Sequence, residues 1–190
     1  MSLPQKAFVL IRHGQTDANR DGVIAGRTEA MLTGTGRAAA AALSARPWPG
    51  RIRVFYSPQQ RAKDTAALIF PGHSLTAHPG LRERDWGLFE GRPLSEQPPR
   101  LSHPSGGEAW EEMLARVALA LRDCLGAAGP ALPVLVAHSG VIRAARALTG
   151  GDYGGASPPN TTPLLFTPRT SGGFEETVFD GKTPYELRHL

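Results

Sequence analysis

AFVLIRHGQT, residues 7–16, passes without a spacer from an apolar run into charged and polar residues. Four of the five residues from 7 to 11 are large and apolar, which is typical of a β-strand buried on both faces. Arg12, His13 and Gly14 follow at once. A hydrophobic core rarely holds a guanidinium or an imidazole, so these side chains either face solvent in a loop or belong to a site.

The length and composition are those of one globular domain. The chain has 190 residues with 41% hydrophobic residues, enough to bury a substantial core, and we expect a single domain over residues 1–190. The net charge of +4 is mild. Of the 21 basic residues, 18 are Arg, and they are scattered rather than gathered in a run, so nothing favours nucleic-acid binding.

Neither a targeting segment nor a disulfide framework is visible in the sequence. The N-terminal residues MSLPQK do not resemble a signal peptide, and no apolar run is long enough to cross a membrane. We therefore expect a cytoplasmic protein without a membrane partner. Cys124 is the only cysteine, which excludes an internal disulfide and a thiolate metal cluster, and its Ala/Leu-rich surroundings predict a small buried hydrophobic residue.

Strand and helix patterns alternate along the chain. The predicted strands are 7–11, 51–56, a short one within 74–83, 132–137, and two late strands, 161–168 and 176–180, as a hairpin at the sheet edge. The predicted helices are 33–46, capped by Thr33 or Thr35, 57–70, with Ser57 as N-cap and Pro58 as first residue, 106–125, and 138–150. This order predicts an α/β fold, a three-layer α/β/α sandwich around a mostly parallel sheet.

Parallel strands bring their carboxyl ends to one edge of a sheet, where ligands bind near helix N-termini. Arg12 and His13 follow the first strand, Arg61 lies in the first turn of the helix after the second, and His138 separates the strand 132–137 from its helix. Four such groups meeting at one edge exceed what a solvated loop requires. The first strand is therefore predicted to end in a site.

Two guanidinium groups beside helix N-termini form a phosphate pocket in physical terms. A neutral His13, with its other ring nitrogen donating to a backbone carbonyl, could attack phosphorus and form a phosphohistidine. His138 would be more useful protonated, as a donor to the phosphoryl oxygens. Glu83, in GLRERDWGLFEG after the third strand, is the candidate general acid for the leaving group.

Four motifs, IRHGQT, YSPQQRAKDTA, LRERDWGLFEG and VAHSGVIR, occur in an order and at spacings similar to those of the histidine phosphatase superfamily, also called phosphoglycerate-mutase-like. The resemblance covers about residues 7–150. It implies the phosphoglycerate-mutase-like fold and chemistry that needs no metal or other cofactor. The sequence likewise has no HExxH, HxH or clustered carboxylate ligand set.

The resemblance also implies roles for single residues. His13 resembles the phosphorylated nucleophile, Arg12, Arg61 and His138 the phosphate pocket, and Glu83 the proton donor. The substrate-binding positions that it implies are Asn19, which matches an Asn on the transferring phosphoryl group, Thr16 and Gly26 on the substrate side, and Trp86 at the pocket mouth.

The superfamily holds mutases and phosphatases, and this chain resembles the phosphatase branch. Mutases carry a long basic insertion where residues 92–107 are short, and an Asn where this chain has Gly140. The lead PSGGEAW resembles α-ribazole phosphatases and broad-specificity phosphatases. We therefore expect a metal-independent phosphatase acting on a small phosphate ester. A phosphoglycerate mutase, a protein phosphohistidine phosphatase and a non-enzymatic phosphate-binding module stay open as alternatives, as does the oligomeric state, monomer or homodimer.

Other basic residues have simpler interpretations. Arg92 or Arg100 could meet a second anionic group of the substrate, although solvated loop positions are the simpler expectation for both. Arg143 and Arg146 are expected on a solvated helix face. The remaining histidines, His73, His78, His103 and His189, are expected at the surface.

Overall fold

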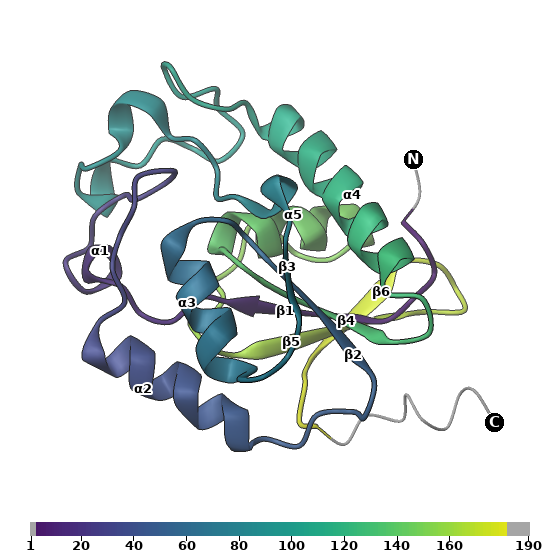
Figure 1. Cartoon of the computed structure of the whole chain (residues 1–190). Helices are drawn as coiled ribbons and strands as arrows, with labels where there is room; N and C mark the ends of the chain where they lie inside the picture. The colour runs from purple at the N-terminus through teal and green to yellow at the C-terminus, as the bar shows by residue number, and fades with distance from the viewer. Residues whose placement is uncertain (1–2, 182–190) are drawn as a thin grey trace.

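The computed structural model describes residues 3–181, which form a six-stranded sheet with helices on both faces (Figure 1). The strands are β1 (Phe8–Arg12), β2 (Ile52–Tyr56), β3 (Leu75–Ala77), β4 (Leu132–Ala137), β5 (Pro163–Pro168) and β6 (Phe174–Val178). The α-helices are α1 (Asp17–Arg20), α2 (Gly34–Ala42), α3 (Gln60–Ile69), α4 (Trp110–Ala127) and α5 (Ser139–Thr149). Short 3-10 helices are η1 (Leu43–Ala45), η2 (Pro79–Leu81), η3 (Gly87–Phe89) and η4 (Leu94–Glu96).

The strand order is β3-β2-β4-β1-β5-β6. The first four strands pair in parallel, and β5 and β6 are antiparallel additions at one side. This arrangement confirms the predicted three-layer α/β/α sandwich with a mostly parallel sheet, including the late hairpin at the edge.

The two faces of the sheet follow from the alternation of side chains along β1. Phe8 and Leu10 belong to the core under α4 and α5, whereas Val9 and Ile11 belong to the core under α2 and α3. All four side chains are fully buried. A strand covered on both faces explains the unbroken apolar run of the sequence.

Helix starts agree with the sequence in one case and differ in another. Thr33 caps α2, with its hydroxyl accepting from the Gly36 amide at 3.0 Å, as one of the two predicted caps. The prediction that Ser57 caps α3 and Pro58 opens it is wrong: the N-cap is Gln59, without a side-chain hydrogen bond. Ser57 is buried and continues the line of β2, because its amide bonds to the carbonyl of Val136 at 2.9 Å.

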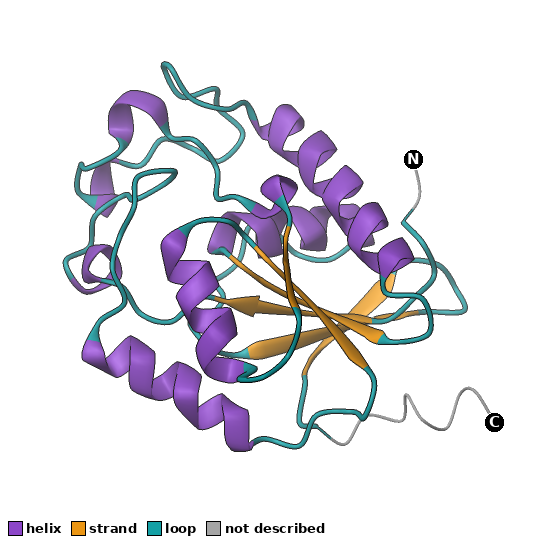
Figure 2. Cartoon of the chain, viewed as in Figure 1, coloured by secondary structure: helices purple, strands orange, loops and turns teal. Residues whose placement is uncertain are grey.

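The sheet register brings three strand ends to one edge. Arg12 pairs with Ala137 in the ladder, and the His13 amide then donates to the Ala137 carbonyl at 3.0 Å. Ser57 holds the equivalent place on β2. The long loops gather beyond the end to which the β1 arrow points (Figure 2).

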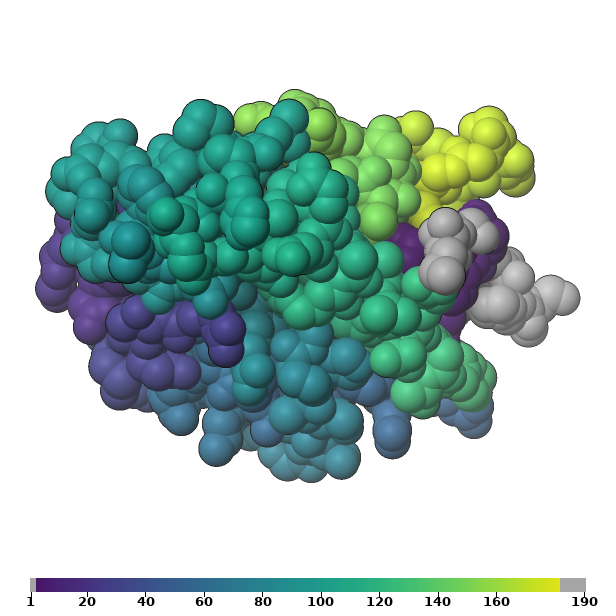
Figure 3. Space-filling model, turned by 90° about the horizontal axis from the view of Figure 1, so that it is seen from above, coloured from purple at the N-terminus to yellow at the C-terminus, as the bar shows by residue number. Residues whose placement is uncertain are grey.

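Two of these loops, residues 16–33 and 82–109, are joined by backbone interactions. Val23 and Pro93 form an antiparallel bridge, and the Ile24 amide donates to the Arg92 carbonyl at 2.9 Å. In the space-filling view the teal loop covers much of the visible face beside the purple N-terminal loop (Figure 3). These two loops thus enclose the edge of the sheet at which the strands end.

Cys124 and the hydropathy of the helices bear on two further predictions. Cys124 is fully buried, as expected, and burial raises the pKa of its thiol to about 12. Among residues 3–181, no helix combines the length and apolar character that spanning a membrane requires. His189 lies outside the described residues.

Candidate active site

A cavity of about 470 Å³ opens at the edge where the strands end. Eight of the nine predicted site residues line it: Arg12, His13, Thr16, Asn19, Gly26, Arg61, Glu83 and Trp86. The ninth, His138, contributes no surface to the cavity and lies beside His13, with 5.2 Å between ring centroids. The fold therefore brings together groups that are separated by up to 126 positions in the sequence, as Arg12 and His138 are.

The His13 ring is held in one tautomer. Its Nδ1 lies 2.8 Å from the Gly14 carbonyl oxygen, which can only accept, so Nδ1 carries the proton. Nε2 makes no hydrogen bond to residues 3–181 and keeps its lone pair. Burial, followed by the charge of Arg61, lowers the pKa of His13 well below its usual value. A neutral imidazole with an available Nε2 is a competent nucleophile.

His138 is also fully buried, as the N-cap of α5. Its Nε2 shares a hydrogen bond with the Ser57 hydroxyl at 2.8 Å, and its Nδ1 has no hydrogen-bond partner within the described chain. Burial and the nearby Arg61 lower the pKa of His138 well below its usual value. A second positive charge beside Arg61 is unfavourable in the protein alone. The protonation of His138 beside a bound phosphoryl group stays a prediction.

The two predicted phosphate-binding arginines are anchored by carbonyl oxygens. Arg61 donates to the carbonyls of Thr28 at 2.9 Å and Gly26 at 2.6 Å. Arg12 donates from Nη1 to the Pro158 carbonyl at 2.9 Å and the Ser157 hydroxyl at 3.2 Å. Carbonyls fix the geometry of a guanidinium without neutralising it, so both keep their charge for an anion.

Gly26 helps to anchor Arg61 through its backbone carbonyl. Its φ of +53° is in the left-handed region, and a Cβ there would lie 2.1 Å from the Oε1 of Glu90. Both constraints favour glycine at this position, since any other residue would strain the backbone and displace the Glu90 side chain. Its predicted contact with substrate stays a prediction, but its carbonyl already holds Arg61.

Asn19 is oriented by two neighbours. Its Oδ1 accepts from the Thr16 amide at 3.2 Å and from Nδ2 of Asn160 at 3.3 Å. The Thr16 hydroxyl accepts in turn from the Asn19 amide, which completes a capping box on α1. Since Oδ1 of Asn19 is occupied, its Nδ2 is the group left to donate to a ligand.

Glu83 docks on the N-terminus of α5. Both of its carboxylate oxygens lie 3.1 Å from the amide of Gly140, and the amide of Glu83 itself donates to Oε1 of Gln59 at 2.7 Å. A positive helix end favours this placement of a carboxylate. The arrangement puts Glu83 in the wall of the same cavity as His13.

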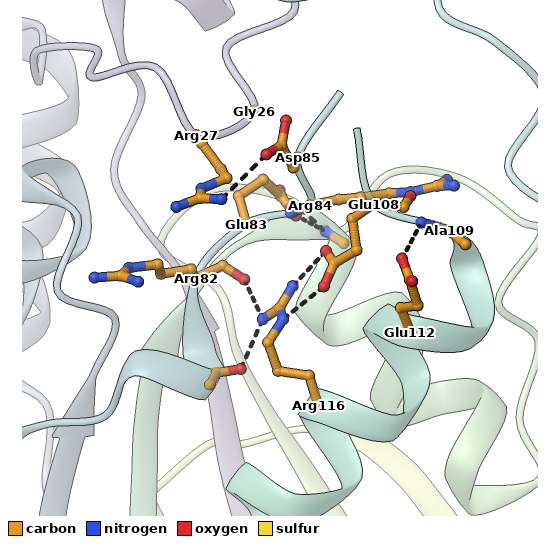
Figure 4. Close-up of polar contacts among 12 residues, drawn as sticks. Gly26, Arg27, Arg82, Glu83, Arg84, Asp85, Glu108, Ala109, Glu112 and Arg116 are labelled. Atoms are coloured by element: carbon orange, nitrogen blue, oxygen red, sulfur yellow. Dashed lines mark hydrogen bonds and ion pairs between the residues drawn. The ribbon is translucent and has the colours of Figure 1, made fainter. Parts of the chain in front are cut away.

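A second set of contacts fixes the backbone that precedes Glu83 (Figure 4). Arg116 of α4 donates from Nη1 to the carbonyls of Gly80 at 2.8 Å and Arg82 at 3.0 Å. Its Nε and Nη2 bind both carboxylate oxygens of Glu108, at 2.7 and 2.6 Å. The two carbonyl bonds tie the backbone on the N-terminal side of Glu83 to a long helix, and the bidentate pair with Glu108 fixes the guanidinium that makes them.

Arg84 performs a similar task for the outer loop. It is almost fully buried and donates to the carbonyls of Arg100 at 2.7 Å, Ser102 at 2.6 Å and Glu108 at 3.0 Å. Its guanidinium also stacks over Trp86, 4.4 Å from the ring centroid. Trp86 is thus both a buried packing residue and part of the cavity wall.

Two arginines expected in solvent belong to the cavity instead. Arg143 is only 6% exposed and lines the cavity, which contradicts the expected solvated helix face, and Arg100 lines it as well. Arg146 is half-buried in an ion pair with Glu176. Arg92 is exposed, as expected, and pairs with Glu96.

Sequence reasoning missed three residues that position the site. Ser57 binds His138, Gln59 binds the backbone of Glu83, and Nδ2 of Asn160 donates to the His13 carbonyl at 2.7 Å. Ser57 could have been found, because it follows a strand end as His13 does. Within residues 3–181, no three side chains among His, Cys, Asp and Glu come together in a group that could hold a metal ion.

Residues 8–156 match the sequence pattern of the histidine phosphatase superfamily (branch 1). The chain belongs to this superfamily. The matched range includes the positions of His13, His138, Arg12, Arg61 and Glu83. The resemblance of the four motifs is thereby confirmed.

Histidine phosphatases and phosphoglycerate mutases are both among its relatives. A probable phosphoglycerate mutase GpmB of Enterobacter sp. (strain 638) is 31% identical over 145 residues, 68% of this chain and 67% of that protein. The metal-independent phosphoserine phosphatase of Arabidopsis thaliana is 30% identical over 156 residues, 72% of this chain and 66% of that protein. Fructose-2,6-bisphosphatase TIGAR B of Danio rerio is 34% identical over 140 residues, 62% and 52% respectively. The chain thus spans about two thirds of the length of the first two and half of the third.

Solved structures of the superfamily share the fold over nearly the whole chain. Phosphoglycerate mutase from Thermus thermophilus matches with a TM-score of 0.71 at 30% identity, covering 92% of this chain and 99% of that one. A putative α-ribazole-5′-P phosphatase of Escherichia coli str. K-12 matches with a TM-score of 0.77, covering 92% and 96%, and at 22% identity it shows the fold alone. The phosphoglycerate-mutase-like fold is confirmed.

Proposed function

We propose that this histidine phosphatase homologue is a metal-independent phosphatase that hydrolyses small phosphate monoesters through a phosphohistidine on His13. The observation that carries the proposal is the His13 ring, whose Nδ1 is fixed on the Gly14 carbonyl while Nε2 keeps its lone pair beside two carbonyl-anchored arginines. A phosphate-binding module without catalysis would need neither an oriented nucleophile nor Glu83 in the same wall.

In the first step the Nε2 of His13 attacks phosphorus, and the bond between phosphorus and the ester oxygen breaks. Glu83, which takes up a proton from the incoming monoester, gives that proton to the ester oxygen, so the leaving group departs as a neutral alcohol. Arg12 and Arg61 bind the phosphoryl oxygens, and Asn19 donates through Nδ2. A phosphate dianion beside His138 would also favour proton uptake by that ring, which the protein alone disfavours.

In the second step water attacks the phosphohistidine. The carboxylate of Glu83 accepts a proton from this water, the nitrogen–phosphorus bond breaks, and inorganic phosphate leaves with His13 neutral again. The same two residues therefore act in both steps, and the chemistry asks for no group beyond the chain, the ester and water.

Gly140 favours hydrolysis over the mutase alternative. A Cβ at this position would lie 2.2 Å from Oε1 of Glu83 and 2.9 Å from Cε of Met113. The Asn that mutases carry here would displace Glu83 from the helix end that it occupies. The short residues 92–107 also lack the basic insertion that is typical of mutases. The partner we propose is accordingly a small molecule in the aqueous phase, not a nucleic acid or a membrane.

The test is hydrolysis of p-nitrophenyl phosphate in the presence of EDTA, with the unaltered chain and His13→Ala. We expect chelator-resistant turnover that His13→Ala abolishes, and a phosphorylated His13 that can be trapped by rapid acid-free quenching and mass spectrometry. Equal rates in the two proteins would overturn the mechanism. Phosphoryl transfer to a phosphoglycerate in preference to water would instead favour the mutase.

A further inference from the structure

The arginines that line the cavity form no ion pair with a carboxylate of residues 3–181. Ion pairs with carboxylates are formed by Arg20, Arg27, Arg37, Arg92, Arg116 and Arg146. None of these lines the cavity. The five that do line it, Arg12, Arg61, Arg84, Arg100 and Arg143, have no carboxylate partner there. Within the described residues, the charge that these five arginines share in the cavity wall is that of Glu83.

This leaves more positive charge than one phosphate ester requires. Glu83 is the only carboxylate among the lining residues, so the five arginines give the wall four net positive charges. A phosphate monoester brings about two negative charges at neutral pH. Arg12 and Arg61 flank His13 and suffice for that group. Two further positive charges are left over.

One of the two belongs to Arg143 on α5. Its Nη1 donates to the carbonyls of Tyr153 at 2.8 Å and Gly155 at 2.6 Å, which fixes the guanidinium in the wall and leaves Nε and Nη2 without protein partners in the described chain. Arg143 follows the N-cap His138 by five residues, about 7.5 Å along a helix axis. Ser139 and Gly140 of the same helix also line the cavity, so this face leads outward from the phosphoryl end.

The other belongs to Arg100 on the outer loop. Its backbone is fixed because its carbonyl accepts from Arg84 at 2.7 Å. Its guanidinium makes no hydrogen bond or ion pair to residues 3–181 and lies 5.9 Å from the Trp110 ring centroid. After burial, the charge of Arg100 is the next largest cause that lowers the pKa of Arg143. Both guanidinium groups line the same cavity, so their charges repel each other, and an anion bound by both would relieve this repulsion.

We propose that Arg100 and Arg143 form a second anion subsite, and that the preferred substrates are phosphate monoesters carrying a second anionic group, a carboxylate or another phosphate. The proposal rests on the proposed function for the phosphoryl end and adds the substrate class. Arg84 differs from these two because each of its three guanidinium nitrogens donates to a carbonyl and its face lies over Trp86. The outer loop thus selects the substrate through Arg100.

The experiment compares substrates in matched pairs. Phosphoserine and phosphoethanolamine differ by one carboxylate, and propane-1,3-diol bisphosphate and 3-hydroxypropyl phosphate differ by one phosphate. For each pair we measure the ratio of kcat/KM in the unaltered chain, in Arg100→Gln and in Arg92→Gln. We expect the ratio to favour the two-anion member, after the twofold statistical factor of the bisphosphate, and to fall about tenfold in Arg100→Gln. Arg92→Gln, an exposed arginine of the same loop, is expected to keep the ratio.

The two pairs separate the two kinds of second anion, because a preference in one pair alone identifies the carboxylate or the phosphate. Arg143→Lys removes the planar group and is expected to lower the same ratio, with its melting temperature measured as a control for the bonds to Tyr153 and Gly155. A ratio of one in both pairs, or an equal change in Arg100→Gln and Arg92→Gln, would overturn the subsite.

Binding keeps this test separate from the proposed function. Calorimetry of the same four compounds with His13→Ala gives the ratio of affinities without turnover. If the unaltered chain hydrolyses none of them while the two-anion members bind more tightly, the hydrolysis proposal fails and the subsite stands. If p-nitrophenyl phosphate is turned over through His13 while the pairs bind alike, the subsite fails and the phosphatase stands.

Discussion

The rings of His13 and His138 meet edge to face, with centroids 5.2 Å apart and an angle of 61° between their planes. In the described chain neither ring is paired with a carboxylate: one binds the Gly14 carbonyl and the other the Ser57 hydroxyl. Both are buried beside Arg61, so the protein alone holds two neutral imidazoles next to fixed positive charge. A phosphoryl group is the complement that such a site needs.

This pair predicts a loss of stability in mild acid. The native pKa of each histidine lies below its unfolded value of about 6.5, so below that pH the unfolded chain binds protons that the native chain does not. The free energy of unfolding should therefore fall as the pH drops, by up to ~1.4 kcal/mol per pH unit for each group. Urea unfolding between pH 7 and pH 5 measures this slope.

The control is His138→Gln, in which the amide can still bond to Ser57. The other titrating groups are common to both proteins, so the difference between their slopes isolates His138. We expect the slope to decrease by up to ~1.4 kcal/mol per pH unit. Identical slopes would mean that His138 takes up its proton over the same pH range in the native and unfolded chains, and would contradict the lowered pKa. Inorganic phosphate should raise the melting temperature of the unaltered chain, because it binds the native state alone.

Replacement of Glu83 by Gln tests the general acid. Alkyl phosphates need a protonated leaving oxygen, whereas p-nitrophenolate leaves unaided, so we expect kcat to fall by about 10²–10⁴-fold for the alkyl ester and much less for the aryl ester. The measurement is the ratio of the two kcat values. Glutamine can accept from the Gly140 amide as the carboxylate does, so the placement of the side chain is preserved. An equal loss on both esters would remove Glu83 from the acid role.

Arg116 and Glu108 should influence the same step without touching the substrate. In Arg116→Lys the side chain can no longer bind both carboxylate oxygens and two carbonyls, so the segment before Glu83 loosens. We expect about a tenfold loss of kcat on alkyl esters, with the aryl ester less affected. Glu108→Gln should act in the same direction.

The matched control is Arg146→Lys. Arg146 forms a bidentate pair with Glu176 of comparable exposure, but neither residue lines the cavity. It should change stability without changing the alkyl-to-aryl ratio. A similar ratio in the two lysine variants would assign Arg116 to stability alone.

Much of the fold could be predicted because its signals are local. The unbroken apolar run before Arg12, the Thr33 cap and Gly150 at the end of α5 each act within a few residues. The gathering of Arg12, His13 and Arg61 also followed from one rule, that parallel strands end at a common edge.

The remainder depends on contacts across the chain. Arg143 has the spacing of a surface helix position, and only the carbonyls of Tyr153 and Gly155 in a distant loop explain its burial. Ser57 has the chemistry of a helix cap, but His138, 81 positions away, takes its hydroxyl. Where a polar side chain has two possible hydrogen-bond partners, the tertiary structure decides which one it takes, and local propensity does not contain that information.

Gly140 is the residue on which the position of Glu83 depends most directly. In Gly140→Ala the new methyl group would lie 2.2 Å from the Glu83 carboxylate, which must then leave the helix end. We expect at least a tenfold loss of kcat on alkyl esters, since a displacement of about 1 Å can cost a hundredfold. Gly126→Ala in α4 is the matched control: nothing lies within 4 Å of its Cβ, so this variant should keep kcat and gain up to about 1 kcal/mol of stability. Full activity of Gly140→Ala on alkyl esters would show that Glu83 works from another position than the one it holds on α5.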